Sequence, residues 1–457
     1  MKFFQNKFTK TLTCALASLT LVGCATFSQD GGFEGVKKVS TAHIKQEIVW
    51  TKSEAEQKVV DDRVSELLKT PLNADSAVQL ALLNNKDLQA SFYKLGISEA
   101  DVVQAGRLPN PKFSMFYARN NGDYKIEQAL TFNIFSLITI PKLLEIERSN
   151  FERTKQSVAL DVLNLAYETR LAYFNAVAAN ERLSYSEQVK ESAEASAELA
   201  RRMVKAGNWN ALERATEQSF YVEAIVDYFN AKNQKTSAHE ALSRLVALPV
   251  EQLSLEKRLP DLPQTIDKLN DYEETAFEQR LDLQAMRLET QALAKQLGLT
   301  KTTRFINVLE IGPARVLEGR RGDPYKKGVD ISFELPLFDW GGAKVAHAEA
   351  TYMQAVNRTA QLAINAQSEI REAYSRYKTN YDLAKHYRDE IVPLRKKVLQ
   401  ENQLRYNGML ISPFELFANA RAQVQSVNSY IATLNEFWLE QTTLEMSLIG
   451  RASKEGK

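Results

Sequence analysis

The sequence has 457 residues, and 58 Lys and Arg balance 57 Asp and Glu to a formal net charge of +1. This even balance of charge excludes the broad basic surface that a nucleic acid partner would need, and we expect no such partner. The length would suit about three ordinary domains, but the long helical periodicity described below favours an elongated protein.

The first 23 residues have the pattern of a secretory signal peptide. Lys2, Lys7 and Lys10 precede an uncharged apolar run over 12–22. This run is too short for a membrane-spanning helix, which needs about 20 residues. We therefore expect residues 1–23 to be removed.

The signal ends in Leu-Val-Gly-Cys, residues 21–24, which resembles a bacterial lipoprotein box. We expect cleavage before Cys24 and acylation of Cys24, palmitate being a typical acyl group. Ala25 follows instead of Asp, which favours sorting to the outer membrane, with 24–71 as a lipid-anchored N-terminal segment. The alternative is an ordinary signal with an incidental cysteine, but the box and the apolar run lie in register.

Cysteine use agrees with this interpretation. Cys14 and Cys24 are the only two cysteines, and Cys14 leaves with the signal. The mature chain would have no disulfide despite an oxidising compartment. Its stability must come from burial and assembly.

Short motifs recur at fixed offsets and indicate two tandem repeats, 72–249 and 272–449. One early motif recurs after 195 residues and three later ones after 201, which places an insertion of six residues between them. The longer segment 315–326, compared with 119–123, is therefore predicted to be a surface loop. The matched anchors are Asp87–Ala90 with Asp282–Ala285, Phe132 with Phe333, Ala172-Tyr173 with Ala373-Tyr374, and Gly207 with Gly408.

The first repeat is expected to begin with a helix over 72–107, capped by Asn73 or Asp75. A β-hairpin follows over 112–134, and the second strand alternates between an apolar and a polar face. Gln128 is the exception on the apolar face. The residues of that face are Tyr124, Ile126, Leu130, Phe132 and Ile134.

A long helix over 141–205 comes next, with Pro141 suited to its first turn. Gly207 then reverses the chain into a returning helix over 211–247. The segment 250–271 has no helical stripe and is predicted to be an equatorial connection.

The second repeat has the same order. A helix over 272–303 and a hairpin over 305–335 precede a long helix over 343–406, which Pro393 is expected to kink. Gly408 reverses the chain into a returning helix over 413–449, and 450–457 form a polar tail. In the last strand Val329, Ile331, Phe333 and Leu335 alternate with Asp330, Ser332 and Glu334.

Helix lengths suggest how the parts combine. A helix of about 65 residues is roughly 100 Å long, and each returning helix is about half of that. If 211–247 stacked on 272–303, and 413–449 on 72–107, each chain would supply four rods of equal length.

The four predicted strands of one chain indicate that several chains assemble. No stretch after residue 24 is apolar enough for a spanning helix, and four strands with bare edges cannot lie in lipid. Closed bacterial barrels need at least about eight strands. We therefore predict a mixed, mainly α fold, with a long α-helical coiled-coil barrel and a small transmembrane β-barrel shared between chains. Three chains, as a homotrimer, would give twelve strands and twelve helical rods. The apolar strand faces would contact lipid and the polar faces water.

Four motifs in this order carry a resemblance to a known family. They are LPNPKFS (108–114), KAGNWNALERATEQ (205–218), LPLFDWGG (335–342) and RYNGMLISPFELFANARAQ (405–423). They resemble the TolC-like outer-membrane efflux factors, in the lipoprotein branch. The resemblance implies an outer-membrane location with a long periplasmic portion. It also implies a passive trimeric conduit for small molecules, served by an inner-membrane pump and a periplasmic adaptor protein. The cargo, whether a drug, a metal ion or another small molecule, is open.

By the same resemblance, the two glycine turns are the expected adaptor-docking tips. Glycine permits the left-handed backbone of such turns, and we expect exposed apolar residues beside it. Turns without a docking role are the alternative. The candidate residues are Gly207, Trp209, Gly408, Met409, Leu410 and Ile411.

Glu213 and Glu415 follow these turns. Three copies of each would form rings of carboxylates at the narrow end of a tunnel, a device for selectivity. Ala418 departs from a pattern with two acids, and a solvated helix face is an equally good interpretation of either glutamate.

Enzyme chemistry is not expected. His43, His239, His347 and His386 stand singly, without metal-ligand spacing, and GRRGDP (319–324) is read as an extracellular turn. We assign no catalytic residue, no metal and no cofactor beyond the lipid on Cys24. The alternatives for function are a periplasmic coiled-coil spacer without a pore and a conduit for type I protein secretion.

Overall fold

The computed structural model describes residues 26–266, 279–305 and 308–451. The expected signal peptide and Cys24 lie outside these residues. The chain is mainly helical, as predicted, and separates into two compact units made of interleaved segments. The first unit includes Phe92–Val158 and Leu283–Leu362, and the second includes Lys37–Ser91, Ala159–Asp282 and the chain from Ala363 onward.

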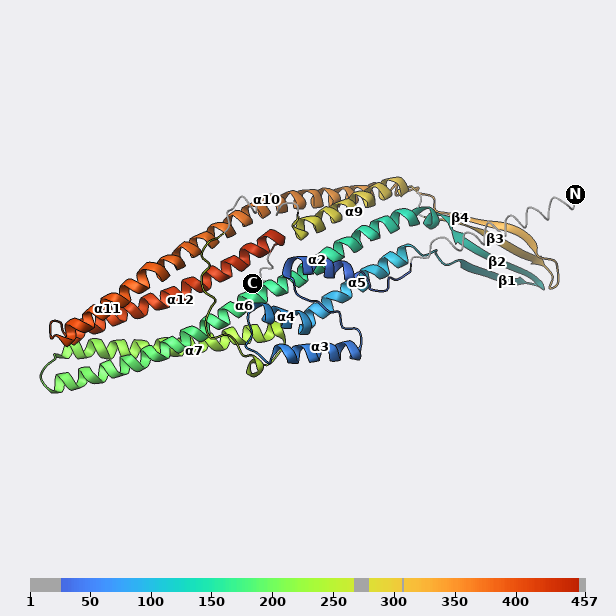
Figure 1. Ribbon diagram of the computed structural model, residues 1–457. Coiled ribbons are helices and arrows are strands. Elements are labelled where there is room, and N and C mark those ends of the chain that lie inside the picture. Colours follow the sequence, from blue (N-terminus) through green and yellow to red (C-terminus); the bar gives the residue numbers. More distant parts are fainter. Residues whose placement is uncertain (1–25, 267–278, 306–307, 452–457) are drawn as a thin grey trace. The chain divides into compact units, whose positions relative to one another are not determined.

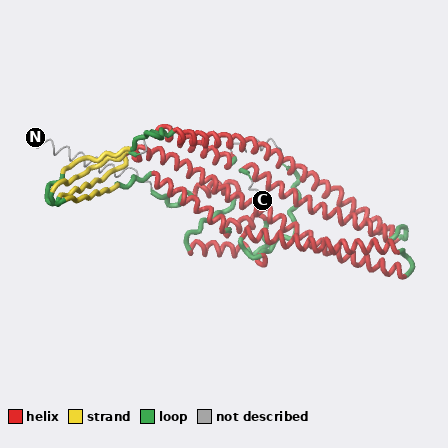
Figure 2. The backbone as a smooth tube through the Cα atoms, turned by 180° about the vertical axis from the view of Figure 1, so that it is seen from behind, coloured by secondary structure: helices red, strands yellow, loops and turns green. Residues whose placement is uncertain are grey.

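The first unit contains one antiparallel sheet in the order β1-β2-β3-β4, drawn in yellow in Figure 2. The strands are β1 Lys112–Asn120, β2 Asp123–Asn133, β3 Leu309–Gly319 and β4 Lys326–Phe333. The central pairing of β2 with β3 joins the two hairpins across a long stretch of sequence. The outer edges of this sheet belong to β1 and β4.

The second hairpin differs from its prediction. β3 extends to Gly319 and β4 begins at Lys326, so the loop between them is 320–325 and not 315–326. Arg315 and Leu317 are strand residues because they pair with Gln128 and Ile126 of β2. The charged residues around them hid this alternation in the sequence.

Strand register gathers the apolar side chains on one face of the sheet, which we call the apolar face. Phe113 pairs with Leu130, and Ile311 with Ile331. Phe333 is 60% exposed, so the face is open to its surroundings. Its apolar residues are Phe113, Met115, Tyr117, Tyr124, Ile126, Leu130, Phe132, Leu309, Ile311, Pro313, Leu317, Val329, Ile331 and Phe333.

The opposite face is mainly polar, apart from Phe116 and Val316, and it carries its own ion pairs. Lys125 lies 2.8 Å from Glu127, and Lys112 lies 3.5 Å from Glu310. Thr131 also donates a hydrogen bond to Glu310, at 3.2 Å. One face is therefore suited to an apolar medium and the other to water.

The predicted helix over 72–107 is two helices, α4 Ala74–Asn84 and α5 Lys86–Ala105. Asn73 caps α4 in a capping box with Ser76. Asn85 interrupts the helix with an extended backbone, and its Oδ1 accepts the N–H of Leu88 at 3.0 Å. The corresponding helix of the second repeat is α9, Leu281–Thr303, and the predicted part of it over 272–278 lies outside the described residues.

The long helix of the first repeat, α6, spans Ile134–Lys205, 72 residues. It begins earlier than predicted because Asn133 accepts the N–H of Ser136 at 2.9 Å and so caps the chain there. Pro141 consequently lies inside the helix and not in its first turn.

The second long helix covers the predicted range without a gap but changes its hydrogen-bond spacing once. α10 spans Gly342–His386, a π turn covers Tyr387–Ile391, and α11 runs over Val392–Asn407 with Pro393 in its first turn. Proline has no N–H and its ring crowds the carbonyl four residues back. The wider π spacing immediately before Pro393 accommodates that ring.

The returning helices are α7, Ala211–Val246, and α12, Pro413–Ile449; they run back beside α6 and α11 (Figure 1). The stacking predicted from lengths is wrong in its partners. Asn85 donates to the carbonyl of Leu245 at 2.9 Å, and Asn84 donates to that of Ala247 at 2.8 Å. The end of α7 therefore meets the start of α5, in its own repeat.

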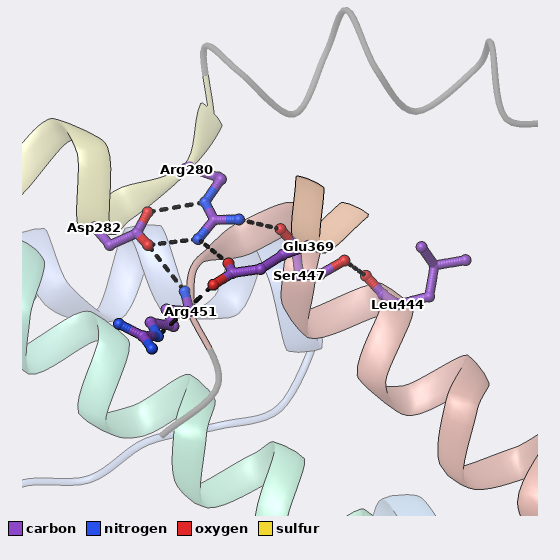
Figure 3. Close-up of polar contacts among 6 residues, drawn as sticks. All are labelled: Arg280, Asp282, Glu369, Leu444, Ser447 and Arg451. Carbon is purple, nitrogen blue, oxygen red and sulfur yellow. Dashed lines mark hydrogen bonds and ion pairs between the residues drawn. The ribbon is translucent and has the colours of Figure 1, made fainter. Parts of the chain in front are cut away.

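Arg280 joins the end of α12 to the start of α9, in the cluster of Figure 3. Its Nη1 donates to the carbonyl of Ser447 at 3.0 Å, and its Nε and Nη2 bind Asp282 at 3.0 and 2.7 Å. Nη2 also reaches Glu369 of α10 at 3.2 Å. Burial by itself would lower the pKa of Arg280, but the bonds to the two carboxylates more than reverse this and raise it.

The N-terminal segment contributes helices α2, Phe33–Ile44, and α3, Glu54–Leu67. Between them the chain is held by glutamine side chains that bind its backbone. Gln79 bonds both the N–H and the carbonyl of Glu47, at 3.0 and 2.9 Å. Gln89 accepts the N–H of Thr51 and donates to the carbonyl of Val49, at 3.1 and 2.8 Å.

The described part of the equatorial connection, up to residue 266, contains one short 3-10 helix, Val250–Gln252. Side chains of the helices hold its backbone. Trp438 of α12 donates to the carbonyl of Pro260 at 3.0 Å, and Tyr381 of α10 donates to that of Gln264 at 2.6 Å. None of the helices in the described ranges combines the length and apolar content of a membrane-spanning helix.

Replacing Arg280 by Ala should lower the free energy of unfolding by about 3–5 kcal/mol, because two half-buried carboxylates lose the buried cation between them. The exposed Arg287 of α9, the helix that begins directly after Arg280, is the matched control, and Arg287→Ala should stay within about 0.5 kcal/mol. Urea unfolding followed by circular dichroism measures both. Equal effects of the two substitutions would contradict the role given to Arg280.

Candidate functional site

The predicted docking tips are the two turns that join α6 to α7 and α11 to α12, and both lie in the second unit. In the first turn Gly207 has φ +80°. The N–H of Asn208 donates to the carbonyl of Met203 at 2.9 Å, and that of Gly207 to Val204 at 3.0 Å. This is the Schellman pattern, with glycine at its left-handed position.

The second turn has the same pattern displaced by one residue. The N–H of Leu410 donates to the carbonyl of Arg405 at 2.8 Å, and that of Met409 to Tyr406 at 2.9 Å. Met409 therefore takes the left-handed position, with φ +58°, while Gly408 has φ −83°. The expectation that Gly408 supplies the left-handed backbone is wrong.

The apolar residues beside the turns differ in exposure. Met409 and Leu410 are 92% and 72% exposed, and Ile411 is half-buried. Trp209 was expected to be exposed, but it is buried. Its ring packs edge-on against Phe417 of α12, with centroids 6.5 Å apart. Trp209 therefore joins the starts of α7 and α12, and the exposed apolar surface lies at the second turn.

Glu213 and Glu415 both occupy the third position of a returning helix. Glu213 forms a capping box with Asn210, since each side chain accepts the other residue's backbone N–H at 2.9 Å. Ser412 accepts the N–H of Glu415 at 3.2 Å. The carboxylate of Glu213 thus takes part in the cap, whereas Glu415 contributes its backbone N–H. Both carboxylates lie at a positive helix end, and Glu415 is the more exposed of the two.

A buried carboxylate near the tips was not recognised from the sequence. Glu217 of α7 is fully buried; it accepts hydrogen bonds from Ser196 of α6 at 2.5 Å and from Arg421 of α12 at 2.8 Å. The signal that could have revealed it is its spacing of seven and fourteen residues from the buried Ala224 and Ala231, which places it on the packed stripe of α7.

The surface of α6 just before the first turn carries a compact ion cluster. Hydrogen bonds from Arg201 and Arg202 lower the pKa of Glu198 to about 2. The distances from Glu198 to both arginines are 2.7 Å. Glu198 is therefore ionised throughout the physiological range.

Within the described ranges, no group of three or more His, Cys, Asp and Glu residues could hold a metal ion. His239 pairs with Asn180 at 3.0 Å, and His386 lies 3.3 Å from Glu390 in the next turn. These are local contacts of single histidines. We assign no catalytic or metal-binding role to them.

Residues 77–248 match the family described as outer membrane efflux protein. No curated protein matches the sequence. Three solved structures illustrate the similarity of fold, and at their low identities the likeness concerns the fold alone.

A membrane protein of Pseudomonas aeruginosa is 18% identical, with a TM-score of 0.70 over 82% of this chain and 93% of the other. The CmeC outer membrane channel of Campylobacter jejuni is 18% identical, with a TM-score of 0.68 over 90% and 91%. The open MtrE outer membrane channel of Neisseria gonorrhoeae is 15% identical, with a TM-score of 0.67 over 84% and 89%.

The left-handed position is occupied by glycine in the first turn and by methionine in the second. Substitutions at these two equivalent positions should therefore change stability in opposite directions. Gly207→Ala should lower the free energy of unfolding by about 1 kcal/mol, because a Cβ disfavours the left-handed backbone, and Met409→Gly should raise it by a similar amount. Gly408→Ala, in an ordinary backbone region, should cause no comparable loss. Apparent unfolding temperatures of the three variants give the ranking, and a loss at Gly408 as large as at Gly207 would contradict the assignment of the turns.

Proposed function

We propose that this chain, an outer-membrane efflux protein by its family over residues 77–248 and by its fold, forms one third of a passive export channel. Such proteins lie in the outer membrane and extend a large helical portion into the periplasm.

The single observation that carries the proposal is the four-stranded sheet with one apolar and one polar face. Strands β1 and β4 are its edges, and unpaired backbone groups on an edge are too costly to leave in lipid. If β4 of one copy pairs with β1 of the next, three copies form a closed ring of twelve strands. The apolar face then contacts lipid, and the ion pairs of the opposite face line a wet interior.

The spacer alternative does not use this sheet. A periplasmic rod without a pore gains nothing from an exposed face that contains Val329, Ile331 and Phe333, which are 68%, 59% and 60% exposed. A face of this kind is a liability in water unless another surface or lipid covers it. Acylation of Cys24 would add a second attachment to the same membrane.

The second turn is the proposed docking surface for a periplasmic adaptor protein, which would connect the channel to an inner-membrane pump. Met409 and Leu410 present apolar side chains to solvent at the end of a helical hairpin. Trp209, Gly207 and Gly408 then act by shaping the tips, not by direct contact. Ile411 would be covered in part by the same partner.

Rings of carboxylates would line the tunnel of the proposed channel. Three copies of the exposed Glu415 would place three negative charges at one level of the tunnel, and Glu213 would add a second set that is partly engaged in capping. Such rings favour cations over anions in a narrow pore. A passive conduit needs no cofactor and no catalytic residue.

The mature protein in detergent should have the mass of a trimer by light scattering corrected for bound detergent, because only closure removes the strand edges. Reconstituted in planar bilayers, the same sample should conduct ions. A stable monomer, or a trimer that does not conduct, would remove the basis for the channel.

Replacing both Met409 and Leu410 by Ser should reduce export in cells that contain the whole system, while leaving the conductance of the purified channel unchanged. The physical reason is loss of exposed apolar contact with the partner. Leu394→Ser provides the control, because Leu394 is 62% exposed on α11 away from the turn. Normal export by the double variant would exclude the second turn as a docking surface.

A further inference from the structure

Gln128 is the one amide among the apolar residues of its strand face, and the register shows why it is there. Met115, Gln128, Arg315 and Lys327 lie opposite one another on β1 to β4 and form a row across the apolar face. Arg315 donates through Nε to Oε1 of Gln128 at 2.6 Å. Gln128 in turn lies 3.9 Å from the sulfur of Met115.

Charge is segregated between the two faces of the sheet. The apolar face of the described strands carries the cations Arg119, Arg315 and Lys327 and no carboxylate. The carboxylates all stand on the opposite face, where Lys125 and Lys326 pair with Glu127 and Glu318. The strand carboxylates are Asp123, Glu127, Glu310, Glu318 and Asp330.

A neighbouring copy cannot supply the missing negative charge. In the proposed trimer each copy presents the same face outward, and that face again lacks carboxylates. A cation that faces lipid is strongly destabilising at the bilayer midplane and costs close to nothing at the interface. The row is therefore expected at a depth where an external anion can meet it.

The position of the row along the strands agrees with an interfacial depth. Lys327 and Phe333 are six residues apart on β4, which is about 20 Å at 3.3 Å per residue, and the apolar band of a membrane barrel is about 25 Å tall. On the loop side of the row lie Tyr117, Tyr124 and Tyr325, together with the apolar Ile126 and Leu317. Arg315 stacks on the ring of Tyr325 at 4.9 Å, and tyrosines are typical of the membrane interface.

We propose that Arg315 and Lys327 form a binding site for the phosphate group of a membrane lipid, at the level where the apolar face meets the lipid headgroups. This rests on the proposed function, because the face contacts lipid only in an assembled channel. Gln128 orients Arg315 through its Nε, which leaves the two terminal amino groups of the guanidinium free to bind two phosphate oxygens. Lys327 adds a second charge from the adjacent strand.

The test uses the mature trimer in detergent and native mass spectrometry. The probes are phosphatidic acid and diacylglycerol with identical acyl chains, which differ only in the phosphate. Wild-type protein should retain phosphatidic acid in preference to diacylglycerol. Arg315→Gln combined with Lys327→Gln should weaken phosphatidic acid binding on the order of tenfold, the effect expected for lost charge-assisted bonds.

Lys326→Gln is the matched control, because Lys326 neighbours Lys327 in sequence but pairs with Glu318 on the opposite face. It should bind both lipids like the wild type. Equal retention of the two lipids by the wild type, or equal losses in the control and the double variant, would overturn the proposal. If the double variant does not assemble, Arg315→Gln alone decides by the same comparison.

The same spectra report the number of copies. A monomer would overturn the channel and this site together. A trimer without preference for the phosphate would overturn the lipid site and leave the channel intact.

Discussion

The last carbonyl groups of a buried helix need hydrogen-bond donors, and this need determines how the second unit is assembled. Asn84 and Asn85 supply the donors for α7, and Arg280 supplies one for α12. The two devices differ in chemistry, one using neutral amides and the other a buried cation with its two carboxylates. They have one result, which is that each returning helix ends against the first helix of its own repeat.

Sequence periodicity predicted most elements because the underlying physics is local. Alternation identified the strand faces within 124–133 and 329–333, although Ile134 begins α6 and Leu335 lies beyond β4. Asn73 was a recognisable cap. Predicted helix boundaries were wrong where a single side chain determines the start or the end of a helix. Asn133 starts α6 before Pro141, and Asn85 divides the first helix, although neither residue breaks the surrounding pattern.

The candidate site was harder to predict because it depends on contacts between helices. A tryptophan beside a glycine turn gives no sign that Phe417, some two hundred residues later, will cover it. Glu217 looks like a surface residue until Ser196 and Arg421 are found around it. The shift of the left-handed position from Gly408 to Met409 depends on which carbonyl the turn engages, and residue type alone pointed to the glycine. Cys24 and the signal remain sequence predictions.

The N-terminal segment between α2 and α3 illustrates a different kind of attachment. Gln79 and Gln89 form hydrogen bonds with the main chain of Glu47, Val49 and Thr51, and these bonds do not involve the side chains of the three residues. The residue types at those three positions of the segment between α2 and α3, here called the tether, can therefore change while the segment stays bound to the helices. The buried Ile48 and Trp50 and the helix cap Ser53 do constrain it. Relatives could therefore vary the three positions widely while they keep the two glutamines, the cap and a pair of large apolar residues.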